Sequence, residues 1–158
     1  MILLYILFVE MIQQLTVRYL EKPFEKTVDS EINWVCESFG FYEKIDKKKT
    51  SAAIFKIIIM KAKDEEGVTT KELGEHLGIS RVSALNHVKK LMTAGLVEQD
   101  GMEYHLRSGN LQRTLREMRR DIIRIFNDID LAARDIDAGV GLKRGKIDRK
   151  TQENNHFI

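Results

Sequence analysis

Hydrophobic residues recur at helical spacing through most of the chain, and the only proline of the 158 residues is Pro23. This pattern predicts a mainly α-helical protein. We expect a first helical region from about Leu3 to Leu20, which ends before Pro23 because the residue preceding a proline is pushed out of the helical basin. A second helix is expected from Val28 to Phe39, capped by Asp29 or Ser30.

The centre of the chain alternates apolar helical stretches with glycines. Ser51 is expected to cap a helix that continues through Met60 and is apolar almost all round, so it should be buried. Thr69 or Thr70 then caps a short helix that ends at Leu77.

A glycine turn and a further helix follow. Gly78 permits the left-handed residue that a tight turn between helices requires. Ser80 is expected to cap a helix from Arg81 to Ala94, which Gly95 ends.

Two short runs after this helix predict a β-hairpin. Leu96–Gln99 and Met102–Leu106 are joined by Asp100-Gly101, a strong local signal for a tight turn. Helix, short helix, glycine turn, capped helix and hairpin is the order of a winged helix-turn-helix.

This stretch, residues 50–106, resembles the winged helix-turn-helix regulators of the ArsR/MarR type. The pieces that carry the resemblance are Glu72-Leu73, Leu77-Gly78-Ile79-Ser80, Val88-Lys89-Lys90-Leu91 and Ala94-Gly95-Leu96-Val97. The resemblance implies a DNA-binding transcriptional regulator. Cys36 is the only cysteine, so the cysteine-based metal site of ArsR-type sensors is not expected.

We therefore expect a mainly α fold: a winged helix-turn-helix with a two-stranded β-hairpin wing, an N-terminal helical extension and a long C-terminal dimerisation helix. The corresponding ranges are 1–46 for the extension, 50–107 for the DNA-binding domain, 109–138 for the dimerisation helix and 139–158 for a flexible basic tail.

The helix that begins after Ser80 is the candidate recognition helix. Its face formed by Ala84, Val88, Leu91 and Gly95 is assigned to the core, so the opposite face presents the candidate base contacts. These are Arg81, Val82, Leu85 and Asn86. Arg81 matches the acceptors of guanine and Asn86 those of adenine. Burial on a second apolar stripe is the alternative for Val82 and Leu85.

Candidate phosphate contacts surround this helix, and no acid occurs from Ser80 to Gly95. They are Thr69, Thr70, Ser80, Ser83, Lys89, Lys90 and Arg107. Phosphate contacts fix register without reading sequence. The hairpin carries Glu98, Asp100 and Glu103, which repel phosphate, so we expect little minor-groove reading by the wing.

An unbroken heptad pattern follows the hairpin and predicts a helix that packs in a coiled coil or bundle. Its seam consists of Leu111, Leu115, Met118, Ile122, Ile125, Ile129, Ala132 and Ile136. We expect a homodimer that places two recognition helices about 34–36 Å apart on an inverted repeat. Packing of this helix along its own domain is the alternative.

Composition excludes little by itself, since the net charge is only +2. No glycine-rich phosphate loop, metal-ligand cluster or paired nucleophile and base is recognised, so we expect no enzyme, no cofactor and no metal. Met1–Val9 is apolar but shorter than the roughly 20 residues that span a bilayer, so no membrane is expected. It is read as a packed helix, or translation begins at Met11. A single cysteine fits a cytoplasmic protein.

The sequence thus predicts a sequence-specific regulator that binds double-stranded DNA as a homodimer, with repression favoured although no residue fixes the sign of regulation. The alternative is a winged-helix module that docks proteins of the transcription machinery without reading DNA. Trp34, Phe39 and Phe126 suggest a pocket for an unidentified small-molecule effector.

Overall fold

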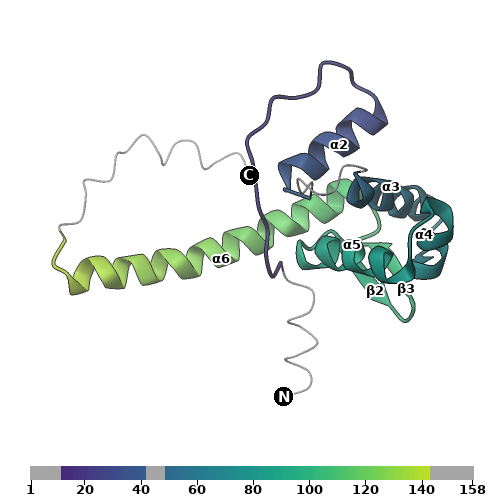
Figure 1. Cartoon of the computed structure of the whole chain (residues 1–158). Helices are drawn as coiled ribbons and strands as arrows, with labels where there is room; N and C mark the ends of the chain where they lie inside the picture. The colour runs from purple at the N-terminus through teal and green to yellow at the C-terminus, as the bar shows by residue number, and fades with distance from the viewer. Residues whose placement is uncertain (1–11, 42–48, 143–158) are drawn as a thin grey trace. The chain divides into compact units, whose positions relative to one another are not determined.

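The computed structural model describes residues 12–41 and 49–142 (Figure 1). The chain forms two compact units that divide after Ile122. Within these ranges the chain is mainly helical, as predicted. The elements are α2 (Val28–Ser38), α3 (Thr50–Ala62), β1 (Val68–Thr69), α4 (Thr70–Leu77), α5 (Arg81–Thr93), β2 (Val97–Asp100), β3 (Glu103–Leu106) and α6 (Leu111–Gly139). No helix in these described stretches combines the length and hydropathy that a bilayer crossing needs.

The sheet has three antiparallel strands in the order β1-β3-β2, so the predicted two-stranded hairpin gains a partner. Val68 pairs with Tyr104, and Asp100 pairs with Glu103. The hairpin loop is therefore Gly101-Met102, one residue later than predicted. Gly101 has φ of 58°, a left-handed value that glycine adopts without strain.

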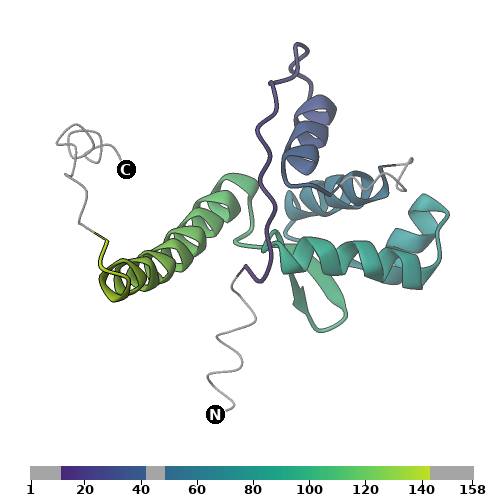
Figure 2. The same cartoon turned by 60° about the vertical axis from the view of Figure 1, so that its left-hand side comes forward.

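The core forms around α3. Ile54, Phe55 and Ile58 of this helix are fully buried together with Leu73 and Leu91. Each such side chain contributes about 1.5–3 kcal/mol by leaving water. The predicted burial of α3 is confirmed. Helix α5 packs beside the β2–β3 hairpin, as both cartoon views show (Figures 1 and 2).

The start of α3 differs from the prediction. Lys49 is the residue at its N-cap, in the left-handed region with φ of 52°, and Ser51 lies inside the first turn. Ser51 is buried, and its Oγ shares a hydrogen bond with His87 Nδ1 at 2.8 Å. Ser51 therefore contacts α5 instead of capping α3.

The segment 12–27, here called the strap, is not helical, so the predicted helix is wrong over residues 12–20. The remainder of that prediction, and the whole apolar stretch Met1–Val9 with its expected packed helix, lie outside the described residues. Backbone N–H groups of Gln13 and Gln14 donate to the carbonyl of Thr93, and that of Arg18 donates to the carbonyl of Ser38. These carbonyls lie at the ends of α5 and α2, where a helix has no internal donors. These hydrogen bonds to other elements stabilise a non-helical strap, although its hydrophobic residues have helical spacing.

Helix α2 has the predicted bounds to within a residue but a different cap. Thr27 Oγ1 accepts from Ser30 N–H at 3.1 Å, and Ser30 Oγ accepts from Thr27 N–H at 3.0 Å. This reciprocal capping box makes Thr27 the cap, whereas Asp29 or Ser30 was expected.

Helix α6 begins where the sequence indicated, with Asn110 Oδ1 accepting from Arg113 N–H at 2.9 Å. The first part of the heptad seam packs within the first unit: Met118 is 2% exposed, and Leu111, Leu115 and Ile122 pack against the core. The alternative of packing along its own domain is therefore correct for this part.

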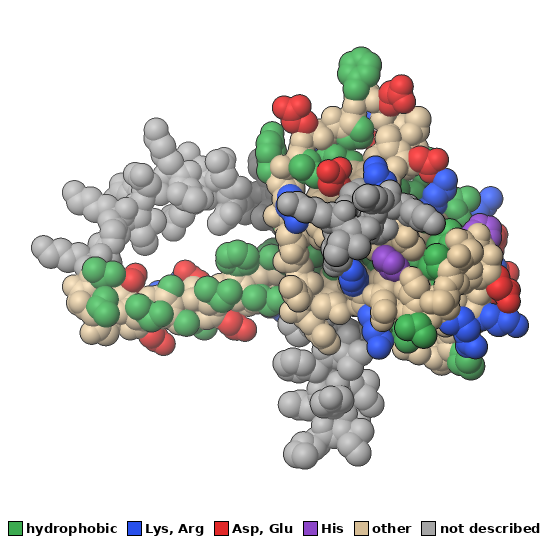
Figure 3. All heavy atoms as spheres, viewed as in Figure 1, with side chains coloured by type: hydrophobic (Ala, Val, Ile, Leu, Met, Phe, Trp, Pro, Cys, Tyr) green, Lys and Arg blue, Asp and Glu red, His purple; other side chains and the backbone are tan. Residues whose placement is uncertain are grey.

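The second unit contains the remainder of α6. Most of its seam residues are exposed, including Ile129 at 55% and Ile136 at 62%. Figure 3 shows hydrophobic side chains lying along this stretch among acidic ones.

Candidate nucleic-acid interface

Helix α4 is fixed at its start by a capping box. Thr69 Oγ1 accepts from Glu72 N–H at 3.2 Å, and the Glu72 carboxylate accepts from Thr69 N–H at 2.7 Å. The backbone and side-chain hydrogen bonds from Thr69 lower the pKa of Glu72 below its ordinary value. The predicted cap is thus confirmed, and it sets the position of the turn that follows.

The turn between α4 and α5 depends on two glycines. Gly78 has φ of 64°, as its predicted role requires. Gly74 was not singled out from the sequence, yet a Cβ there would lie 2.8 Å from the Ile79 carbonyl oxygen. The Ile79 N–H donates to the Gly74 carbonyl at 3.1 Å, so the turn folds tightly onto α4.

Helix α5 buries the predicted face, because Ala84, Val88 and Leu91 are fully inaccessible. Its start is capped by Ser80, whose Oγ accepts from Ser83 N–H at 3.1 Å. The capped start and the buried face together fix which side chains point outward.

The candidate base contacts differ in exposure. Arg81 and Asn86 are exposed, and Val82 is 68% exposed. Leu85 is partly buried and packs against the core, as its alternative reading proposed. Arg81, Val82 and Asn86 therefore form the accessible part of the predicted set.

Basic and hydroxyl side chains lie on the same two helices. Lys89 is exposed, Lys90 and Ser83 are half-buried, and α5 contains no acid. The Ser80 hydroxyl accepts a hydrogen bond from the backbone N–H of Ser83. The Thr69 hydroxyl instead donates to Glu72 Oε2 at 2.8 Å, while Thr70 opens α4.

Arg107 has an internal role that sequence reasoning missed. Its Nη1 lies 2.8 Å from Asp121 Oδ2, with side-chain exposures of 11% and 5%, and its Nη2 lies 3.8 Å from Glu117. This ion pair joins the end of the sheet to α6. The only signal in the sequence was Asp121, an acid beside the hydrophobic seam of α6. An acid on a solvent-exposed helix face would give the same pattern.

His87 is partly buried, and its hydrogen bond to Ser51 joins α5 to α3. The hairpin keeps its predicted acidic character. His105 Nε2 lies 3.4 Å from the Glu103 carboxylate, and Glu98 and Asp100 are exposed. Negative charge thus surrounds the hairpin while α5 remains basic.

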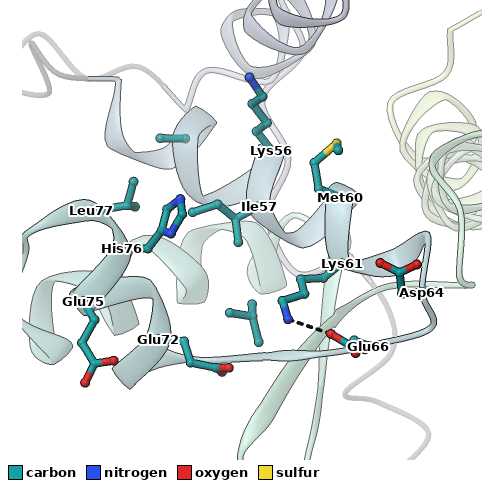
Figure 4. A pocket seen from close by; sticks show the side chains of 12 residues that line it. Lys56, Ile57, Met60, Lys61, Asp64, Glu66, Glu72, Glu75, His76 and Leu77 are labelled. Carbon is teal, nitrogen blue, oxygen red and sulfur yellow. Dashed lines mark hydrogen bonds and ion pairs between the residues drawn. The ribbon is translucent and has the colours of Figure 1, made fainter.

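A groove of about 950 Å³ lies between α3, β1 and α4 (Figure 4). Ile57 and Met60 line it together with the carboxylates of Asp64, Glu66, Glu72 and Glu75. Lys61 Nζ lies 2.7 Å from Glu66, and this hydrogen bond raises the pKa of Lys61. Among the residues that the structure describes, no three His, Cys, Asp or Glu side chains are arranged to hold a metal ion.

A second cavity, of about 770 Å³, lies in the first unit and is lined by Trp34 and Phe39, two residues of the suggested effector pocket. The third, Phe126, belongs to the second unit and is 65% exposed.

Comparison of the chain with protein-family models, curated proteins and solved structures found no match.

Proposed function

We propose that the protein is a winged helix-turn-helix regulator that binds double-stranded DNA in a sequence-specific manner through α5. One observation supports this most strongly. A capped, acid-free helix is held by its buried face, so Asn86 and Lys89 stay exposed on its other side, and Arg81 is exposed at its first residue.

In this proposal α5 enters the major groove with its N-terminal residues nearest the bases. Arg81 pairs with guanine and Asn86 with adenine, because their paired donors and acceptors match those base edges. Val82 contacts a thymine methyl. Ser80, Ser83, Thr70, Lys89 and Lys90 contact phosphate and fix the register. Arg107 has no part in binding, since its charge is engaged by Asp121.

The homodimer is formed by the exposed seam of α6. Two copies then present two α5 helices to an inverted repeat, one helical turn apart. Dimer binding across a promoter would exclude other proteins from that DNA, which favours repression.

A second candidate function is a docking module for other proteins. The acidic hairpin and the groove of Figure 4 favour it, because the groove combines the exposed Met60 with four carboxylates. Such a surface suits a basic, amphipathic partner segment.

The test measures affinity for the DNA upstream of the protein's own gene and for scrambled DNA of equal length, across a salt series. We expect at least about 1,000-fold tighter binding to the specific DNA and a steep fall in affinity with salt. Arg81→Ala should cost about 1–3 kcal/mol on specific DNA alone. Lys71→Ala, an exposed lysine on α4, is the matched control. Equal, weak binding to both DNAs would favour the docking module.

A further inference from the structure

We propose that the cavity beneath the strap binds a small apolar carboxylate and couples its binding to α5. The strap contributes residues 17–22, α2 contributes Trp34, Val35 and Ser38, its C-cap residue Phe39 follows, and α6 contributes Leu115. We call this the strap cavity. Its volume of about 770 Å³ is in the range of small-molecule sites, and its wall is mainly hydrocarbon.

Two buried donors distinguish the strap cavity from a plain apolar hollow. Trp34 Nε1 and Ser38 Oγ are, among the described side chains, buried without a hydrogen-bond partner. They lie one helical turn apart on α2, and both side chains line the cavity. A buried donor without an acceptor is destabilising, so a ligand that supplies an acceptor is favoured.

The charge around the cavity indicates an anionic ligand. Arg18 and Lys22 line it against the single acid Glu21. A carboxylate accepts hydrogen bonds from both donors and pairs with these cations, while an alkyl chain fills the apolar part. Neither donor atom touches solvent, so binding must turn the Ser38 hydroxyl and the Trp34 indole toward the ligand.

The strap connects this cavity to α5. The backbone N–H groups of Gln13 and Gln14 donate to the Thr93 carbonyl at the end of α5, at 3.0 and 3.2 Å. The backbone N–H of Arg18 donates to the Ser38 carbonyl at 2.8 Å. A ligand that moves the strap therefore changes the hydrogen bonds between the strap and the end of α5. This coupling, unlike the binding itself, rests on the proposed function.

The binding test uses the full chain and three probes with one tail: octanoate, octanol and octylammonium. Trp34 is the only tryptophan, so its fluorescence reports on the cavity directly. We expect saturable binding of octanoate, about 10-fold weaker binding of octanol and no binding of octylammonium. Equal binding of octanoate and octanol, or no binding of octanoate, would overturn the proposal. A fluorescence change that follows protein concentration without any octanoate would also overturn the proposal, because a second copy of the chain would then cover the strap cavity.

Calorimetry on variants then tests the two donors. Trp34→Phe and Ser38→Ala each remove a donor and keep an apolar wall, and each should weaken octanoate binding about 10-fold without lowering the melting temperature. Arg18→Gln should weaken it as well, whereas Arg116→Gln, an exposed arginine on α6, should not. Unchanged affinity in the Trp34→Phe, Ser38→Ala double variant would overturn the proposal.

The coupling is measured as DNA affinity with and without saturating octanoate. We expect at least a 5-fold change. If octanoate binds but specific DNA affinity stays constant, the coupling is wrong. If no specific DNA binding exists, the proposed function fails while the fluorescence result stands.

Discussion

At the scale of single residues, hydrogen bonds at helix ends decide how α4 presents the turn to α5. Replacing Thr69 by Ala removes the cap of α4 and should lower the free energy of unfolding by about 1 kcal/mol. Urea denaturation measures this, with Thr70→Ala as the matched control because Thr70 lies inside the helix. Equal stability of the two variants would contradict the role of the cap.

The same cap has a pH dependence. Because Thr69 lowers the folded pKa of Glu72, this carboxylate stabilises the protein above its ordinary pKa of 4.5. That contribution is lost as pH falls through the lowered folded value. The stability difference between wild type and Glu72→Gln, which cannot ionise, should therefore narrow below about pH 4.5, which denaturation at several pH values will show.

Asp121 is the other residue with a large expected effect. Asp121→Asn removes the nearer and more buried of the two carboxylates that pair with the Arg107 guanidinium and should cost roughly 3 kcal/mol. The exposed Asp128→Asn on the same helix is the control for chemical denaturation. A loss below about 0.5 kcal/mol would show that the pair does not hold α6 to the sheet.

At the scale of elements, helices with local signals were predictable and segments held by distant partners were not. Caps and glycines identified α4 and α5, because Thr69, Gly78 and Ser80 act on neighbouring residues. Residues 12–20 of the strap were predicted as a helix, because the hydrogen-bond partners of the strap, Thr93 and Ser38, are distant in sequence. Strand β1 has only two residues, too few for an alternating pattern.

The candidate site shows the same division. Exposure of Asn86 followed from the buried stripe of α5, which sequence periodicity reveals. Arg81 lies seven residues before the buried Val88, on the same side of the helix, and is exposed at the first residue of α5. The pairing of Arg107 with Asp121 could not be predicted in this way, because it joins two different elements and periodicity describes only one element at a time. The heptad seam was continuous in sequence, yet its first part packs in the first unit.

At the scale of the whole molecule, the exposed seam of α6 is proposed to join two copies. Ile129→Glu places a charge on this seam and should convert a dimer to a monomer at micromolar concentration. Analytical ultracentrifugation measures the mass, and Asn127→Glu, off the seam on the same helix, is the control. The melting of the individual domain should change little, since Ile129 is 55% exposed. A dimer that persists in Ile129→Glu would place the interface elsewhere.

The central claim is that α5 reads bases, and selection from a random DNA library tests it most directly. Wild-type protein should enrich an inverted repeat with half-sites about 10 base pairs apart. Arg81→Ala should enrich the same repeat with preference lost at one symmetric guanine position. No enriched sequence, or an identical sequence with Arg81→Ala, would contradict the account.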